Sequence, residues 1–222
     1  DITMLSNVAV VENIEPTIGV VASDNEGSSV VIEGDDFSDN DTLQLTITSI
    51  DTSNSTERSA IPGDLENPYT LFFVGLTEFT FINESTNQEV NLAAGKTAEI
   101  TIPITRNIKS DGTAYAVGDS IQLYYLNEDT GIWTQEGSAT VEVENNSPTG
   151  FAATGTISHF SWWALSYPSN PAIVGSYASE DRTYDITLSA NGQRAFIADG
   201  SAGIKILDIS DFNNITLLGS FN

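Results

Sequence analysis

The sequence predicts an all-β fold, namely an antiparallel two-sheet β-sandwich followed by a single propeller-blade-like β unit. Short β-branched and aromatic runs recur along the 222 residues, and Leu43–Ile50 alternates apolar with polar residues, as a half-buried strand does. Turns rich in Gly, Asn, Asp and Pro separate the runs. No helical period of three to four residues is sustained. About nine or ten strands of this kind are typical of a sandwich.

The first 17 residues are β-branched but lack a clear turn framework, so we expect a linker, or an edge or donor strand, over residues 1–17. The sandwich is expected over residues 18–165, with a loop at 51–68. Pro103 suggests that its strand lies at a sheet edge, because proline cannot donate to a ladder. The predicted strands are 18–22, 28–33, 43–50, 71–74, 78–82, 98–104, 120–126, 131–137 and 139–144, of which 120–126 and 131–137 form a hairpin.

Composition excludes several classes of protein. There are 31 Asp and Glu against 7 Lys and Arg, a formal net charge of −24. Nucleic acid and anionic membrane are therefore not expected as partners, because phosphates require basic clusters. The chain has no cysteine, which excludes disulfides and thiol catalysis. No apolar run approaches the ~20 residues of a transmembrane helix, so membrane insertion is not expected.

A domain boundary is expected at the Pro/Ser/Asn-rich linker 166–171. Beyond it, residues 172–177 (AIVGSY) match 216–221 (TLLGSF) at an offset of 216 − 172 = 44 residues, a period typical of propeller blades. Since one blade cannot bury both of its faces, residues 172–222 are expected to be a fragment of a larger array.

This second part of the chain resembles the LVIVD-type β-propeller repeat of bacterial surface proteins. The resembling residues are Tyr184-Asp185-Ile186, Ala198-Asp199-Gly200 and Ile206-Leu207-Asp208-Ile209-Ser210. The resemblance implies an extracellular or cell-surface protein of bacterial origin.

The segment Ser158–Trp163 contains the only histidine and two of the three tryptophans. In an extended strand, His159 and Ser161 would share one face, and a local kink could bring the imidazole to the hydroxyl. Ser161 could then attack the Phe160 carbonyl in an N→O acyl shift, provided that a base, a distorted peptide and oxyanion donors are present. In the alternative interpretation, Phe160 and Trp162 fill the core while His159 and Ser161 only form hydrogen bonds at a strand end.

Residues ~60–165 also resemble the zonula-occludens/Unc-type (ZU-type) β-sandwich. The matching features are Pro62-Gly63-Asp64, Gly95-Lys96, Tyr124-Tyr125-Leu126, Gly131-Ile132-Trp133 and the closing His159-Phe160-Ser161-Trp162-Trp163. Autoproteolytic members of that family are cut between the Phe and Ser of such a triplet. The resemblance therefore implies Phe160–Ser161 as the scissile bond, Ser161 as the nucleophile and His159 as its activator.

Two further groups of residues are candidate sites. Acidic side chains cluster near the early turns and could bind Ca²⁺, which takes six to eight oxygen ligands, although such residues also dominate ordinary turns and no EF-hand spacing is present. They are Asp24, Glu26, Asp35, Asp36, Asp39 and Asp41. Glycan acceptors in Asn-x-Ser/Thr triplets are Asn40, Asn54, Asn83, Asn145 and Asn214. No cofactor is otherwise expected.

The leading hypothesis is a non-enzymatic structural or adhesive module that presents or spaces a propeller region. Its partner would be a protein, a surface glycan or another copy of the chain. Self-processing at Phe160–Ser161 is an alternative, and it would be a single-turnover reaction. A third hypothesis is a subunit of a surface filament or layer, in which residues 1–17 donate a strand to the next copy. A turnover enzyme is not expected, because no phosphate loop, zinc ligand set or separately placed triad is present.

Overall fold

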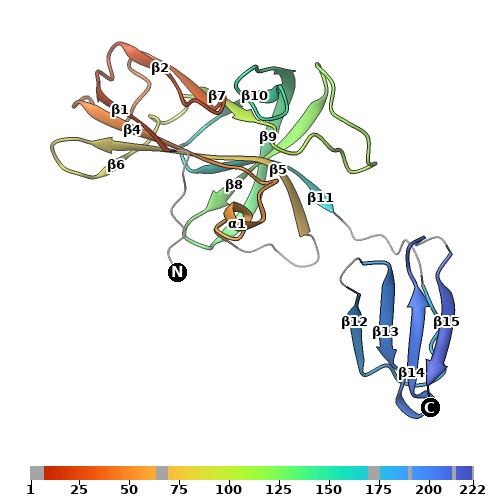
Figure 1. Cartoon of the computed structure of the whole chain (residues 1–222). Coiled ribbons are helices and arrows are strands. Elements are labelled where there is room, and N and C mark those ends of the chain that lie inside the picture. The colour runs from red at the N-terminus through yellow and green to blue at the C-terminus, as the bar shows by residue number, and fades with distance from the viewer. Residues whose placement is uncertain (1–7, 64–69, 170–175, 190–191, 212–213, 222) are drawn as a thin grey trace. The chain divides into compact units, whose positions relative to one another are not determined.

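The computed structural model describes residues 8–63, 70–169, 176–189, 192–211 and 214–221. It divides the chain into two compact units, residues 1–170 and 171–222 (Figure 1). Antiparallel strands form both units, so the predicted all-β class is confirmed.

The larger unit is one antiparallel sheet of eleven strands that folds over on itself (Figure 1). The order is β1-β4-β5-β11-β8-β9-β10-β7-β3-β2, and β6 pairs with β5 off this path. Its two layers therefore belong to one hydrogen-bonded path. The strands are β1 (Val8–Ile14), β2 (Gly19–Ser23), β3 (Ser29–Glu33), β4 (Leu43–Ile50), β5 (Thr70–Asn83), β6 (Glu89–Val90), β7 (Ala98–Pro103), β8 (Ser120–Asn127), β9 (Ile132–Val143), β10 (Phe151–Ile157) and β11 (Trp162–Ser169).

The core lies between the two layers and follows the alternation of the strands. Leu43, Leu45 and Ile47 of β4 are fully buried, which confirms the predicted inward face. They belong to the same apolar cluster as Ile100 of β7 and Trp163 of β11. Burial of one large aliphatic or aromatic side chain stabilises a fold by roughly 1.5–3 kcal/mol. This cluster therefore holds the two layers together.

A buried polar link also joins the layers. Asp24, in the turn after β2, accepts hydrogen bonds from the backbone of Ser28 (2.8 Å) and from the hydroxyl of Ser49 in β4 (2.5 Å). The hydroxyl of Ser28 bonds those of Ser49 (2.6 Å) and Thr77 of β5 (2.9 Å). Since polar groups are buried at low cost only when they are paired, this chain of bonds fixes the β2–β3 turn against β4 and β5.

Three expectations about the larger unit are corrected. Residues 166–169 are not a linker, because β11 continues through them with Ser166 fully buried. Residues 51–68 contain a one-turn helix, α1 (Ser55–Arg58), which Asn54 caps by accepting a hydrogen bond from the Thr56 N–H. The strand that holds Pro103 is not at an edge, since β7 lies between β10 and β3. Pro103 is its last residue and lies beyond the positions that pair with β3.

Other predictions agree with the structure. The hairpin across Gly131 is confirmed as β8 and β9. Within residues 1–17, β1 is an edge strand that pairs with β4 of its own chain, and residues 1–7 lie outside the described residues.

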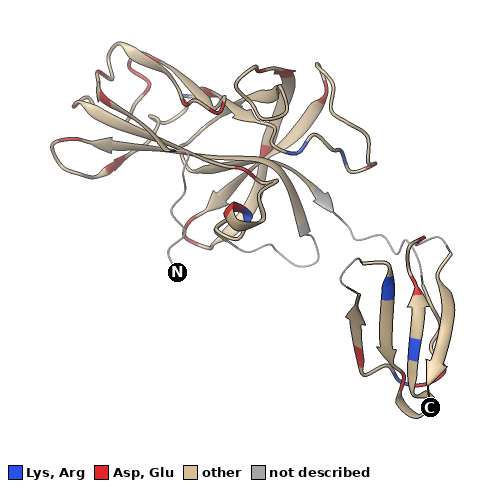
Figure 2. Ribbon diagram, viewed as in Figure 1, with Lys and Arg blue, Asp and Glu red and all other residues tan. Residues whose placement is uncertain are grey.

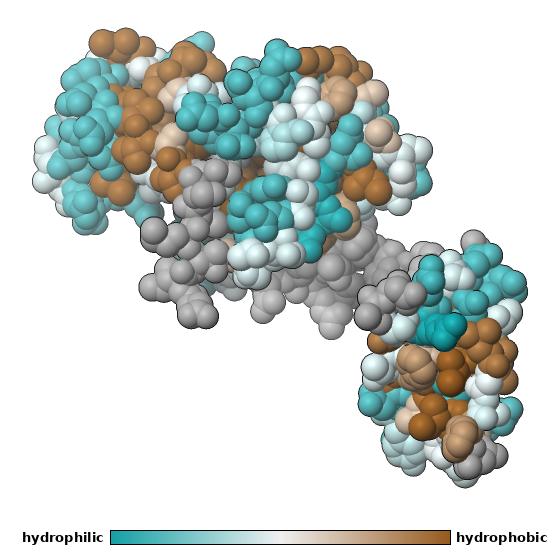
Figure 3. Space-filling model, viewed as in Figure 1, coloured by the Kyte–Doolittle hydropathy of each residue, from teal (hydrophilic) through white to brown (hydrophobic). Residues whose placement is uncertain are grey.

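The smaller unit is a four-stranded antiparallel meander in the order β12-β13-β14-β15. Its buried apolar cluster has four members, Ala195, Ile197, Leu207 and Ile209. Many other apolar side chains reach its surface, where they form the brown areas of Figure 3. The strands are β12 (Asp185–Leu188), β13 (Arg194–Ala198), β14 (Ile204–Asp208) and β15 (Thr216–Phe221), with a 3₁₀ turn at Gly200–Ala202. The predicted repeat segment 172–177 lies mostly outside the described residues.

Candidate functional site

The His-Phe-Ser segment forms a bend between two strands. β10 ends at Ile157 and β11 begins at Trp162, so His159 and Ser161 are not part of an extended strand, contrary to the sequence-based expectation. Glu136 of β9 holds the bend by accepting a hydrogen bond from the Ser158 hydroxyl (2.7 Å). The Trp163 indole N–H donates to the carbonyl of His159 (3.2 Å).

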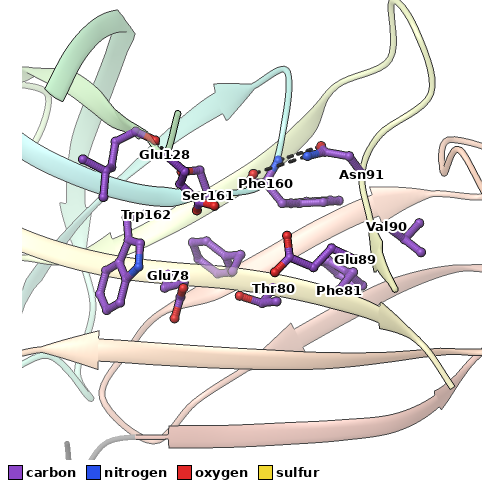
Figure 4. Close-up of a pocket in the computed structure, with 12 residues that line it drawn as sticks. Glu78, Thr80, Phe81, Glu89, Val90, Asn91, Glu128, Phe160, Ser161 and Trp162 are labelled. Carbon is purple, nitrogen blue, oxygen red and sulfur yellow. Dashed lines mark hydrogen bonds between the residues drawn. The ribbon is translucent and has the colours of Figure 1, made fainter. Parts of the chain in front are cut away.

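Phe160 is anchored through both its ring and its backbone. The ring is buried and lies 4.4 Å from that of Phe81, centroid to centroid. The backbone N–H of Phe160 donates to Asn91 Oδ1 (2.8 Å), and Asn91 Nδ2 donates to the Phe160 carbonyl (3.4 Å), as Figure 4 shows. The side chain of Asn91 thus pairs with Phe160 as the backbone of a neighbouring strand would. It also provides one donor to the carbonyl that a self-cleavage reaction would attack.

His159 and Ser161 contact different partners. The hydroxyl of buried Ser161 donates to the carbonyl of Leu126 (2.8 Å). His159 Nε2 lies 3.7 Å from a carboxylate oxygen of Glu136, and the imidazole packs on the rings of Tyr125 (4.5 Å) and Trp163 (5.1 Å). No described hydrogen bond joins His159 to Ser161. The contacts therefore match the alternative in which this segment closes the core, but the tryptophan in the core is fully buried Trp163, and the expected Trp162 is half-buried.

No residue of the bend has a left-handed backbone conformation. Among the described residues, the non-glycine residues with a left-handed φ are Asn13, Asp35 and Asn87, and none of them lies in the bend. A strained peptide is one of the requirements for attack by the hydroxyl. Of the requirements for attack, the structure shows a donor to the carbonyl oxygen, Asn91 Nδ2.

A groove of about 540 Å³ opens beside this segment. Its lining includes Phe160, Ser161 and Trp162 together with three carboxylates, Glu78, Glu89 and Glu128 (Figure 4 labels them). Burial raises the pKa of Glu78 above its ordinary value, and the negative charges of Glu128 and Glu89 add to this shift. The groove is thus an acidic recess beside aromatic rings, and sequence reasoning did not find it because its carboxylates are far apart in the chain.

The acidic residues proposed for calcium have other partners. Asp24 belongs to the buried link described above, and Asp36 forms an ion pair with Lys96. Asp39 and Asp41 are brought together at Asn83, whose Nδ2 donates to both of them (2.8 and 3.3 Å). Hydrogen bonds from the Asp41 backbone and from Asn83 lower the pKa of Asp39. Within the described part of the chain, no three acidic, His or Cys side chains are arranged to hold a metal ion. Calcium binding through Glu26 and Asp35 with these residues stays a prediction.

The five candidate glycan acceptors differ in exposure. Asn83 is 1% exposed and its amide is bound to the two aspartates, so the folded protein does not present it. The exposed candidates are Asn40, Asn54, Asn145 and Asn214.

Charge is spread over the molecule. In Figure 2, the acidic residues recur in turns and strand ends of both units. Among the described residues, no helix has the length and apolar character needed to cross a membrane.

Two residues that hold the bend, Asn91 and Glu136, were not predicted as part of the site. Asn91 is 69 positions from Phe160 in the sequence. No local motif indicated this pairing, and only the strand order brings the two residues together.

Comparison with known proteins identifies the second unit. Searches of curated proteins and of solved structures gave no match. Residues 184–222, which contain β12 to β15, match the family described as LVIVD repeat. The predicted propeller-type repeat is therefore confirmed for this part of the chain.

Proposed function

We propose that this chain is a non-enzymatic structural or adhesive module of a bacterial cell surface, in which the larger unit presents or spaces a propeller-type repeat. The observation that carries the proposal is the LVIVD unit with its small core. Tyr184, Ile186 and Leu188 on or beside β12 are 58–71% exposed, and Phe221 of β15 is 80% exposed. An antiparallel unit with this much apolar surface is suited to packing against further units of its kind.

Tandem repeats test the structural part of this proposal. Further copies of residues 178–221 would be joined to the C-terminus, and hydrogen exchange in β12–β15 would be measured. We expect slower exchange with each added copy, because neighbouring units cover the exposed side chains. Exchange that does not change with copy number would contradict the proposal. The location is tested separately, by protease treatment of intact source cells: release of fragments of this chain supports exposure on the surface, and their absence contradicts it.

Self-cleavage at Phe160–Ser161 is the second candidate function. It is supported by the ZU-type resemblance and by the Asn91 Nδ2 donor on the Phe160 carbonyl (3.4 Å). The bond from the Ser161 hydroxyl to the Leu126 carbonyl (2.8 Å) would have to break before attack. The intact mass of the purified protein is the test. Two fragments that meet at Ser161, and that disappear in Ser161→Ala, would support cleavage, whereas a single full-length mass contradicts it.

Strand donation by residues 1–17 is the third candidate. It is supported by the position of β1 at the sheet edge, where, among the described strands, it pairs with β4 alone. When donated, β1 of one molecule would pair with β4 of the next molecule, at the position that the molecule's own β1 occupies in this structure. Deletion of residues 1–17 should then abolish any polymer seen by electron microscopy.

A further inference from the structure

Among the described residues, no strand pairs with the outer edge of β2, which lies at one end of the sheet path. Its neighbour in the sheet is β3, and the path ends there. The Asp24 N–H donates to the carbonyl of Ser28 (2.9 Å), so Asp24 faces β3. Because hydrogen-bonded positions alternate in an antiparallel pair, Ala22 and Val20 also face β3, while the N–H and C=O of Val21 point away from it. Val21 is therefore the outward-facing residue at the centre of this five-residue strand.

The side chains above this edge are apolar and exposed. Val21 is 81% exposed, and its cross-strand neighbour Val31 of β3 is 37% exposed. The strand reads Gly-Val-Val-Ala-Ser and has no charged residue, although the chain has a formal net charge of −24. An uncharged, apolar edge is a template for pairing with another strand.

The opposite end of the path is protected. β1 carries the exposed acidic residue Glu12, and its register shifts between Val11 and Ile14, where Asn13 has a φ of 58°. Charges and bulges of this kind prevent edge-to-edge pairing. β2 has neither feature, so the two ends of the same sheet differ in the property that controls association.

We propose that β2 is a self-association edge, at which β2 of a second copy pairs antiparallel about a two-fold axis through Val21. This arrangement places Val21 opposite Val21 of the second copy and Gly19 opposite its Ser23. No charged residue of either β2 then faces another, which is what two molecules of high like charge require at close contact. The row Val31–Val21 of one copy continues into Val21–Val31 of the other and covers both exposed valines.

The expected dimer is weak, because two five-residue strands bury less surface than a stable interface does. Its dissociation constant should be on the order of 10⁻⁴ M. Repulsion between the two acidic molecules opposes the contact, so raising the salt from about 0.05 M to about 0.5 M should strengthen association. An interface formed by ion pairs would weaken instead. The direction of the salt effect therefore distinguishes the two.

Sedimentation equilibrium of the whole chain tests the proposal, at concentrations up to about 1 mM, where a dimer of this affinity is populated. We expect the average mass to rise from the monomer value towards twice that value. Val21→Lys places two like charges at the centre of the contact. Val21→Pro removes an outward N–H that no described strand of the same chain uses. Each variant should weaken the dimer at least about tenfold. Leu218→Lys is the matched control, since it puts the same charge on another exposed, uncharged edge strand, β15.

Circular dichroism would show that each variant is folded. Amide exchange gives a second readout, because the Val21 N–H should become protected as the concentration rises. The proposal would be overturned if Val21→Lys dimerised as strongly as the unmodified chain. It would also be overturned if the unmodified chain remained a monomer at the highest protein and salt concentrations. Loss of the dimer in Leu218→Lys with retention in Val21→Lys would place the contact in the smaller unit and would also overturn it.

Discussion

The two units of this chain bury apolar surface to very different degrees. The larger unit encloses Trp163, Phe79 and Leu45 at 0–1% exposure between two layers of one sheet. Among its described residues, the smaller unit buries four apolar side chains and leaves half or more of Leu218 and Phe221 in solvent. The same alternating pattern therefore gives a complete core when the sheet folds over on itself and an incomplete one when the sheet stays open.

The buried polar groups differ in the same way. In the larger unit they are mostly hydroxyls, such as Ser28 and Thr77, which are paired within the core. In the smaller unit they are charged. Lys205 is 4% exposed and pairs with Glu180 (3.0 Å), and fully buried Asp199 accepts hydrogen bonds from the Glu180 and Asp181 backbones (2.9 and 3.2 Å). Charged groups thus occupy the buried polar positions of the smaller unit, whereas hydroxyls occupy most of those in the larger unit.

The largest expected effect is in the core of the larger unit. Trp163→Ala should lower the free energy of unfolding of that unit by about 3–5 kcal/mol, because it removes a fully buried indole and leaves a cavity. Urea denaturation followed by circular dichroism would measure it. Trp162→Ala is the control, since this ring is half-buried and a smaller loss is expected. Exchange rates in β12–β15 should not change, and a parallel loss of protection there would show that the two units unfold together.

Leu207→Ala makes the corresponding test in the smaller unit. We expect a loss of about 2–3 kcal/mol, at the lower end for a buried leucine, because the small cluster can relax around the gap. Hydrogen exchange resolved by segment is the measurement. Faster exchange confined to β12–β15 is the expected result. Equal effects in both units would contradict the independence of their cores.

The polar link of the larger unit should matter less than its core. Asp24→Ala leaves the Ser28 N–H and the Ser49 hydroxyl without their acceptor, so about 1–3 kcal/mol of stability should be lost. Thermal or urea unfolding would show it. Glu26→Gln serves as the control, because only the backbone N–H of Glu26 bonds Asp24. A loss equal to that of Asp24→Ala would mean that the charge of the turn, and not the link, is responsible.

The smallest expected effects are in the pH dependence of stability, where Asp181 of the smaller unit and Glu78 of the larger unit act in opposite directions. Hydrogen bonds from the Ser201 hydroxyl and backbone, and from the Arg182 backbone, lower the pKa of Asp181 from 3.8 to about 2. Its contribution to the smaller unit is present above pH ~4 and is lost as the pH falls towards 2. The pKa of Glu78 is raised above its ordinary value of 4.5, so its ionised form destabilises the larger unit. This penalty decreases as the pH falls through the raised pKa and is absent well below pH 4.5.

Melting curves of two variants would separate these contributions. Asp181→Asn should lower the stability of the smaller unit at neutral pH and remove its loss below pH ~4. Glu78→Gln should slightly raise the melting temperature of the larger unit at neutral pH. If both variants changed stability at neutral pH in the same direction, the opposite roles assigned to Asp181 and Glu78 would be contradicted.

Sequence reasoning succeeded where the signal is local. The alternation of Leu43–Ile50 gave the buried face of β4, and the short loop ending in Gly131 gave the β8–β9 hairpin. It failed where the position of a strand in the sheet depends on partners that are distant in the sequence. Pro103 suggested an edge, but the strand is interior because it pairs with both β10 and β3. The proline is tolerated there because the pairing with β3 ends before it.

The candidate site shows the same limit. The triplet His159-Phe160-Ser161 was found from the sequence, but its contacts were not. Glu136, Leu126 and Asn91 reach it from three other parts of the chain. These partners direct the imidazole and the hydroxyl to different places, which no pattern within the triplet could indicate.

The strand order has a consequence for how the protein is made. β1 and β2 are consecutive in the sequence yet occupy the two ends of the sheet path. The β2–β3 hairpin can form early, but its place beside β7 exists only once residue 98 has left the ribosome, 98 − 33 = 65 residues after β3 ends. At about 5–20 residues per second, this leaves the valine-rich hairpin undocked for roughly 3–13 seconds of translation. During that interval, nascent chains made side by side could capture each other's hairpins, and a chaperone that binds short apolar strands would protect this stretch first.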